Sequence, residues 1–258
     1  MMESVLKKIS SLKVIQKTRS FLAPPVIDHL GVSICTDSKH INAKITAKIL
    51  DGEYESDEIY FIDEYVNGDE TVVELGGCIG FTACYTNKII DKNNDHIVVE
   101  ANKNLIPIIK HNKGINDCDF KVIQSAYSYG KSRAKISVPE NAWGGSLYRN
   151  SDRTYNVDCI TIKDIIEKFD ISKFTLIADI EGSEISLINN ELDIIESECS
   201  LVIIEFHDKK NVYSNVQYKI KRCRKKLAKS SLISIDKNNS STVEVYSNPK
   251  FNSFHKEV

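Results

Sequence analysis

The chain has 258 residues, of which 41% are hydrophobic and 27% are charged, and its formal net charge at pH 7 is −2. These proportions are ordinary for a globular protein with one sizeable core, and the near-neutral charge argues against a nucleic-acid partner held by phosphate neutralisation. Seven cysteines without a C-x-x-C pair, and the lack of an apolar run of about 18 residues, predict a cytoplasmic protein without a transmembrane segment.

The first fifty residues are predicted to form an extension, residues 1–50, ahead of a main domain, residues 51–258. Residues 2–20 carry apolar side chains at near-helical spacing among several lysines, which predicts an amphipathic helix that Pro24 and Pro25 end. We favour packing against the core for this helix over contact with a membrane surface. Residues 31–50 alternate in a way that predicts a hairpin or strand pair before a turn at Asp51-Gly52.

Strands alternate with helices through the main domain, which predicts a mainly parallel sheet. Helices are predicted over residues 56–66, from Phe81 onward, and over residues 105–112, 162–169, 183–195 and 212–229. Strands are predicted from Thr71 and over residues 96–100, 120–125, 174–180 and 200–206, with a closing hairpin over 232–246. Residues 127–156 lack periodicity and predict an irregular or antiparallel insertion near the mouth of an active site.

A glycine-dense turn follows the strand that begins at Thr71. Glycine permits a positive φ and lets a ligand approach the backbone closely. The spacing is not the G-x-G-x-x-G of dinucleotide sites, because Cys78 and Phe81 stand where glycine would be required. The Glu-x-Gly-x-x-x-Gly pattern from Glu74 to Gly80 is that of a nucleoside cofactor without a pyrophosphate, although an ordinary tight turn fits it equally well.

Acidic residues stand at the ends of the predicted strands. Glu100 ends the second strand of the sheet, 20 residues beyond Gly80, where a carboxylate can accept both hydroxyls of a ribose. A strand-end carboxylate that faces water is the alternative. Glu74 is expected beside the same pocket, with the amino group of the cofactor or the backbone of the turn as its partner.

A second group of polar residues follows the next two strands. Asp179, Glu181 and Glu184 come after one strand, and Glu205 and His207 after the next. Charge at the end of a buried strand is costly unless it is paired or used. His207 is suited to acid-base chemistry because the usual histidine pKa lies near neutral. For Glu181 and Glu184, the alternative is that acids at a helix N-terminus complement the helix dipole.

Taken together, these residues resemble the FkbM family of S-adenosylmethionine-dependent methyltransferases over roughly residues 51–208. The resemblance rests on Gly52-x-Tyr54-Glu55, residues 73–81, Val99-Glu100-Ala101-Asn102, Asn112, Ala126, residues 161–164, residues 177–184 and Ile204-Glu205-Phe206-His207. The Asp-Ile-Glu-Gly-x-Glu block and the later Glu-Phe-His are its most specific parts. The family commonly has asparagine where Cys78 stands, proline where Ala101 stands and lysine where Ala178 stands.

The resemblance implies a Rossmann-like class I methyltransferase with a seven-stranded, mainly parallel sheet, helices on both faces and an antiparallel C-terminal hairpin. It also implies bound S-adenosylmethionine (SAM) and methylation of a hydroxyl on a sugar, glycan or related metabolite, including phosphorylated ones, in surface-polysaccharide or natural-product biosynthesis. The residues expected to bind the cofactor are Glu55, Glu74, Gly76, Gly77, Cys78, Gly80, Phe81, Glu100, Ala101, Asn102, Ser125, Ala126 and Asp179.

Catalysis is assigned to Asp179, His207 and Glu181, with His207 as the base and Asp179 as the group that orients it or binds the acceptor hydroxyl. Trp143 and Glu205 are expected to contact the acceptor; the alternative for Trp143 is a plug over the sheet edge. No metal ligand is predicted, although Asp179, Glu181, Glu205 and His207 could instead collect a Mg²⁺-like ion.

Three other functions fit parts of the pattern. A nicotinamide-dependent oxidoreductase shares the fold but needs a different glycine spacing. A non-catalytic glycan-binding or scaffolding module is disfavoured by the intact set of Glu74, Gly76, Gly80, Glu100 and Asp179. An RNA or protein methyltransferase is disfavoured by the near-neutral charge and by the lack of an Asn-Pro-Pro-Tyr-type tetrapeptide. The sequence does not identify the acceptor.

Overall fold

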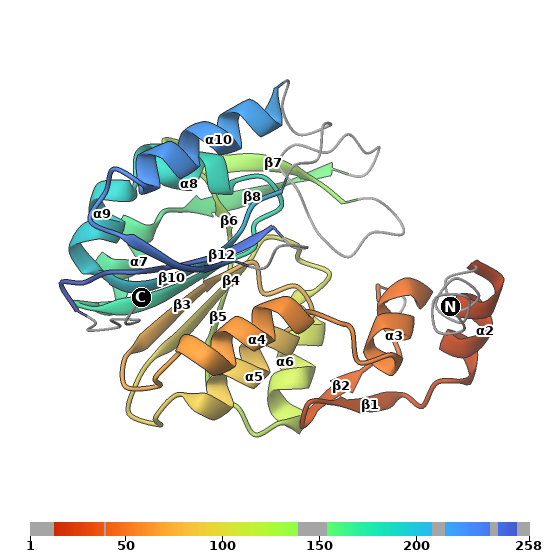
Figure 1. Ribbon diagram of the computed structural model, residues 1–258. Helices are drawn as coiled ribbons and strands as arrows, with labels where there is room; N and C mark the ends of the chain where they lie inside the picture. Colours follow the sequence, from red (N-terminus) through yellow and green to blue (C-terminus); the bar gives the residue numbers. More distant parts are fainter. Residues whose placement is uncertain (1–12, 39, 139–153, 208–214, 238–241, 252–258) are drawn as a thin grey trace, which may run out of the picture.

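A seven-stranded sheet forms the centre of the computed structural model, which describes residues 13–38, 40–138, 154–207, 215–237 and 242–251 (Figure 1). The strand order is β11-β12-β10-β9-β3-β4-β5. The four neighbouring pairs formed by β10, β9, β3, β4 and β5 are parallel, and β12 runs antiparallel between β10 and β11. The bounds are β3 Thr71–Leu75, β4 His96–Glu100, β5 Lys121–Gln124, β9 Phe174–Ala178, β10 Cys199–Glu205, β11 Ile233–Lys237 and β12 Val243–Ser247. The predicted mainly parallel sheet with an antiparallel C-terminal hairpin is confirmed.

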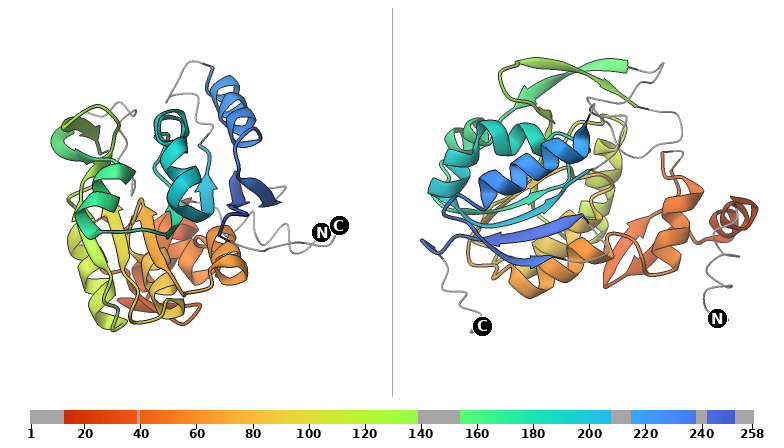
Figure 2. Two further views of the ribbon diagram at one scale, coloured as in Figure 1. Left: turned by 90° about the vertical axis from the view of Figure 1, so that its left-hand side faces the viewer. Right: turned by 45° about the horizontal axis from the view of Figure 1, so that its top comes forward.

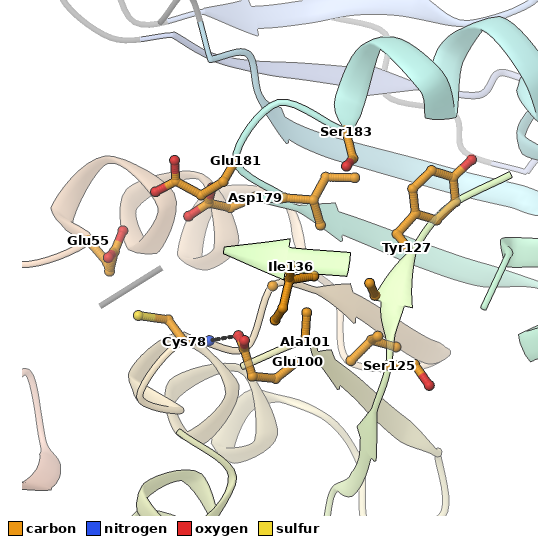
Figure 3. Close-up of a pocket in the computed structure, with 14 residues that line it drawn as sticks. Glu55, Cys78, Glu100, Ala101, Ser125, Tyr127, Ile136, Asp179, Glu181 and Ser183 are labelled. Carbon is orange, nitrogen blue, oxygen red and sulfur yellow. Dashed lines mark hydrogen bonds between the residues drawn. The ribbon is translucent and has the colours of Figure 1, made fainter. Parts of the chain in front are cut away.

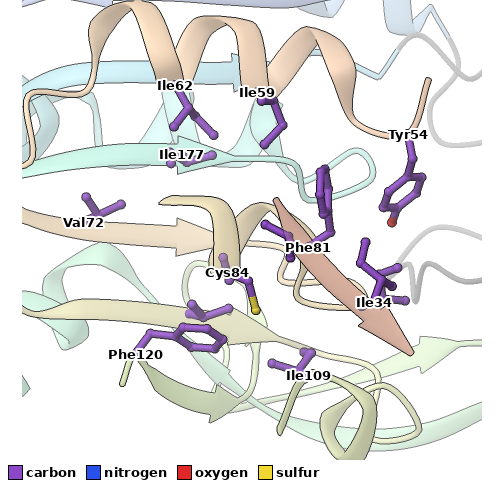
Figure 4. Close-up of a cluster of buried hydrophobic side chains, with 14 of the residues drawn as sticks. Ile34, Tyr54, Ile59, Ile62, Val72, Phe81, Cys84, Ile109, Phe120 and Ile177 are labelled. Atoms are coloured by element: carbon purple, nitrogen blue, oxygen red, sulfur yellow. The ribbon is translucent and has the colours of Figure 1, made fainter. Parts of the chain in front are cut away.

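Helices cover both faces of this sheet (Figures 1 and 2). One face carries α4 (Ser56–Tyr65), α5 (Phe81–Ile89) and α6 (Ile106–Ile115); the other carries α7 (Ile162–Phe169), α8 (Glu184–Asn190), α9 (Leu192–Glu198) and α10 (Val216–Leu227). Because successive strand residues point to opposite faces, Val72 packs into the cluster under α4 and α5 (Figure 4), and Val73 into the cluster on the other side. Every helix within the described ranges is too short or too polar to span a membrane.

The N-terminal segment differs in part from its prediction. It contains α2 (Lys13–Leu22), a hairpin of β1 (Val26–His29) and β2 (Val32–Cys35), and α3 (Ala43–Leu50). The hairpin therefore begins before residue 31, and the strand expected up to residue 50 is a helix. The side chain of Asn42 accepts hydrogen bonds from the backbone N–H groups of Lys44 and Ile45, which caps α3. Residues 2–12 of the predicted first helix lie outside the described residues.

The extension is attached beside the glycine turn. Asn112 in α6 accepts a hydrogen bond from the Cys35 backbone at 2.9 Å, and its amide nitrogen donates to the Ile79 carbonyl at 2.8 Å. Buried Ile34 belongs to the same hydrophobic cluster as Phe81 (Figure 4). We propose residue 50 as the sequence boundary of an extension that packs into the main domain. At its far end, Phe21 and Leu22 of α2 are exposed.

Two later segments also add detail to the prediction. The helix predicted over residues 183–195 is broken into α8 and α9 at buried Glu191, whose carboxylate accepts the Ile162 and Lys163 backbone N–H groups at the start of α7. The insertion contains β6 (Ala126–Tyr127), β7 (Arg133–Ser137) and β8 (Thr154–Ile160). β7 and β8 are antiparallel, which agrees with the antiparallel form of the predicted insertion. Trp143 lies outside the described residues.

Candidate active site

The main pocket opens at the carboxyl ends of β3, β4 and β9, and encloses about 660 Å³ when the space open to solvent is included (Figure 3). Parallel α/β sheets bind ligands at this edge. Eight of the residues predicted to bind a cofactor line the pocket: Glu55, Gly76, Cys78, Glu100, Ala101, Ser125, Ala126 and Asp179. Glu181, predicted to be catalytic, also lines it.

The other predicted residues lie around this pocket. Glu74, Gly77 and Phe81 line a smaller neighbouring cavity between the β3 turn and α4, whereas Gly80 and Asn102 line neither cavity. Glu74 is buried and its Oε2 lies 3.3 Å from His96 Nε2, so its partner is a side chain that sequence reasoning left unassigned. The available signal was the position of His96 as the first residue of a predicted buried strand.

The glycines of the turn are required by the packing of the backbone. Gly76 has φ +101°, and a Cβ there would lie 1.8 Å from the Asp179 carbonyl oxygen. A Cβ on Gly77 would lie 2.5 Å from the Val98 side chain. The turn therefore fits against the neighbouring strands, which is a reason for glycine separate from the approach of a ligand that the sequence predicted.

Glu100 points into the pocket from the end of β4 and holds the glycine turn (Figure 3). Its Oε2 accepts a hydrogen bond from the Cys78 backbone at 2.8 Å, and its Oε1 accepts one from the Asn102 backbone. Burial raises the pKa of the Glu100 carboxyl to about 7, although these hydrogen bonds oppose the rise. The Glu100 carboxyl therefore changes between its protonated and ionised forms within the physiological pH range.

Three side chains around the pocket come from strained backbone positions. Glu55, Cys78 and Glu181 have φ values of 49°, 45° and 49° and so adopt the left-handed conformation without being glycine. Such a residue costs roughly 1–2 kcal/mol and is retained where the surrounding structure holds it, often at functional sites. All three residues line the pocket.

His207 lies among four carboxylates beside the pocket and is only 8% exposed. Its Nδ1 lies 2.9 Å from Glu184 Oε1. Its Nε2 lies 3.5 Å from Asp179 Oδ1, 3.6 Å from Glu205 Oε2 and 3.9 Å from Glu181 Oε2. The structure thus brings together all the polar residues that the sequence placed after these two strands.

Glu184 is the member of this group whose role the sequence did not resolve. It is 1% exposed at the start of α8, and its Oε1 also accepts the backbone N–H groups of Ile180 and Gly182, each at 3.1 Å. These donors hold Oε1 in place as a hydrogen-bond acceptor, so the Nδ1–H group of His207 is the donor in their contact. Glu184 therefore fixes the orientation of the imidazole ring.

The carboxylates change the protonation of His207. Burial alone would lower its pKa, but the Glu184 hydrogen bond and the charges of Asp179 and Glu205 raise the pKa of His207 to about 10. His207 is then an imidazolium at neutral pH in the protein without a bound cation, which differs from the near-neutral base expected from its sequence position. Burial raises the pKa of the Asp179 carboxyl well above its usual value, against the opposing charge of His207.

Several residues that line the two cavities were not singled out from the sequence. Ile136 reaches the pocket from β7, inside the insertion, and Tyr127 from β6. Glu58 lies in the first turn of α4, one turn after Glu55, and faces the smaller cavity. Its spacing from Glu55 was the one indication that both acids share a helix face.

Comparisons with known proteins complete the description of this site. The sequence profile of the Methyltransferase FkbM domain matches residues 74–250. Comparison with curated protein sequences found no match. Among solved structures, the chain is similar to an O-methyltransferase from Bacillus cereus in complex with SAH, with 10% identity and a TM-score of 0.47 over 74% of this chain and 81% of that one. The O-methyltransferase TomG from Streptomyces achromogenes, involved in tomaymycin synthesis and in complex with SAM, has 9% identity and a TM-score of 0.47 over 75% and 79% of the two chains.

Proposed function

Since the chain belongs to the FkbM family of SAM-dependent methyltransferases, we propose that it methylates a hydroxyl group of a sugar, a glycan or a related metabolite. The observation that carries the choice of acceptor is the group of carboxylates around His207, which adjoins the pocket through Asp179 and Glu181. Carboxylates accept hydrogen bonds from hydroxyl groups, and a hydroxyl needs a proton acceptor before it becomes a good nucleophile.

The pocket residues fit SAM as the methyl donor. Glu100 places a carboxylate in the pocket, and we assign it to the ribose hydroxyls. The turn from Gly76 to Cys78 contributes backbone without bulky side chains. Asp179 Oδ1 is buried and has no hydrogen-bond partner among the described residues, so a polar ligand atom would satisfy it. When bound, SAM supplies a methyl group that is already activated on a sulfonium, which leaves alignment and exclusion of water to the protein.

The acceptor is assigned to the side of the pocket formed by Asp179 and Glu181. His207 is protonated in the protein without a cation, so a carboxylate is the better proton acceptor. We assign Glu181 as the proton acceptor, and Asp179 on the same wall, whose carboxyl pKa is raised by burial, is the alternative. Glu205, further out, and Trp143 are assigned to acceptor binding.

The proposed setting is the biosynthesis of a surface polysaccharide or a natural product in the cytoplasm. The seven cysteines are all free thiols, which suits a reducing compartment.

Two measurements test this function. Titration calorimetry of the full chain should show one SAM site that Glu100→Ala weakens about tenfold or more, the value of a lost charged hydrogen bond. Methyl-labelled SAM, incubated with a panel of nucleotide sugars, glycans, phosphorylated sugars and hydroxylated natural products, should give a product heavier by one labelled methyl group on oxygen. Label found only on protein or RNA would contradict the choice of acceptor.

A further inference from the structure

We propose that Asp179, Glu205 and His207 bind one six-coordinate divalent cation, of the Mn²⁺ or Mg²⁺ class, beside the cofactor pocket. Each residue offers one ligand atom, and the three atoms lie within 4.8 Å of one another. The side chains come from two neighbouring strand ends and include an imidazole with a fixed orientation, so the site is more than a cluster of acids.

The strand register brings the three residues together. β9 and β10 are parallel neighbours in which Ala178 pairs with Ile204, so Asp179, just after β9, and Glu205, the last residue of β10, lie at the same level of the sheet. His207 lies two residues after Glu205 in the chain. Figure 3 shows Asp179 directed toward the same end of the pocket as Glu181.

The distances fit the coordination of one small ion. His207 Nε2 lies 3.5 Å from Asp179 Oδ1 and 3.6 Å from Glu205 Oε2. Two ligands bound at about 2.1 Å in octahedral geometry are about 3 Å apart when adjacent and about 4.2 Å apart when opposite. A cation can therefore be accepted with small side-chain movements.

The surroundings orient each ligand. Glu184 Oε1 accepts a hydrogen bond from the Nδ1–H group of His207 at 2.9 Å, and in the neutral ring this directs the Nε2 lone pair toward Asp179 and Glu205. A histidine that binds a metal commonly donates its other N–H group to a carboxylate in this way. Thr242 donates to Oε1 of Glu205 at 2.8 Å, so that Oε2 is the oxygen turned toward the histidine.

The local charge also favours a cation. Oδ1 of Asp179 is buried without a hydrogen-bond partner among the described residues. In the part of the chain that the structure describes, no lysine or arginine forms an ion pair with Asp179 or Glu205; their ion-pair contacts are with His207 alone. Two half-buried carboxylates this close together need a positive partner, and a divalent ion supplies more charge than one imidazolium.

The ligand set selects the class of ion. Carboxylate oxygens suit Mg²⁺ and Mn²⁺, and the imidazole nitrogen adds affinity for the transition metal. On the proposed function, the open positions would bind the acceptor hydroxyl. Its proton would pass to Glu181, its oxygen would form the new bond to the methyl carbon, and the electron pair of the broken carbon–sulfur bond would remain on sulfur. The binding site itself does not depend on that assignment.

Electron paramagnetic resonance of free Mn²⁺, added to chelator-treated full chain, tests the site directly. We expect one bound Mn²⁺ per chain and displacement by excess Mg²⁺. Glu205→Gln and His207→Ala should each weaken binding at least tenfold, and the positioning variant Glu184→Gln should weaken it by about 10–100-fold. Asp193→Asn removes an exposed acid at the start of α9 and should bind Mn²⁺ as the unaltered chain does.

Folding and cofactor binding are measured on the same samples, by circular dichroism and by calorimetry with SAM. Absence of stoichiometric Mn²⁺ binding, or binding that survives both Glu205→Gln and His207→Ala in folded protein, would overturn the cation site. A chain that binds SAM but does not bind Mn²⁺ would contradict the cation site and leave the proposed function intact. A chain that binds Mn²⁺ in the expected way but does not bind SAM would support the cation site and contradict the proposed function.

Discussion

The carbonyl oxygen of Asp179 lies 1.8 Å from the position that a Cβ on Gly76 would occupy. The turn after β3 and the end of β9 are therefore packed backbone to backbone, and this contact joins the residues assigned to the cofactor to those assigned to the acceptor. Hydrogen bonds from Asp179 N to Leu75 O and from Gly76 N to Val99 O hold the same region.

We expect Gly76→Ala to destabilise the whole fold as well as cofactor binding, because the added methyl group overlaps a backbone atom. Gly130 is the matched control: its φ is +73°, but a Cβ there meets nothing within 4 Å. Gly130→Ala should cost about 1 kcal/mol from left-handed strain alone, and Gly76→Ala more than about 3 kcal/mol, as measured by urea unfolding. Similar losses for the two variants would show that the contact is unimportant.

The affinity for SAM should rise with pH. The pKa of Glu100 is raised to about 7, and only its ionised form accepts hydrogen bonds from both ribose hydroxyls. Between pH 6 and pH 8 the ionised fraction grows about tenfold, and the association constant from calorimetry should grow by the same factor. Glu100→Gln should bind more weakly and without this slope. The same slope in that variant would assign the titration to another group.

Asn112 should matter for stability more than for chemistry. It is fully buried and connects the Cys35 backbone of the extension to the Ile79 carbonyl of the glycine turn. Asn112→Ala leaves the part-buried N–H of Cys35 and the buried carbonyl of Ile79 without this partner, which we expect to cost about 1–3 kcal/mol for each group left unsatisfied. His111→Ala, at the preceding exposed position of α6, should be close to neutral in the same unfolding measurement.

Glu181→Gln should lower kcat by about 10²–10⁴ while leaving the SAM dissociation constant nearly unchanged, because a general base acts on the acceptor proton. Glu167→Gln, which removes an exposed acid on α7, is the control. Steady-state kinetics with an identified acceptor would measure kcat and KM for both variants. A change confined to KM would mean that Glu181 binds the acceptor and does not take its proton.

Local patterns in the sequence were sufficient for most of the architecture. The alternation of strands and helices, the glycine turn and the acids at strand ends each depend on neighbouring residues, and the sheet and pocket followed from them. The helix Ala43–Leu50 was missed because its apolar residues also alternate, and the cap from Asn42 was not recognised. The break at Glu191 was missed because it depends on the distant N-terminus of α7.

The sequence by itself determined which chemical groups stand at the carboxyl edge of the sheet, because a strand, its turn and its final acid are contiguous. Only the tertiary structure decided how those groups meet. It turned Glu74, which lines the smaller neighbouring cavity, toward His96, and it raised the pKa of His207 by surrounding the ring with carboxylates. The physical reason is that interactions between charges depend on distance and burial, and strand register sets both for residues far apart in the chain.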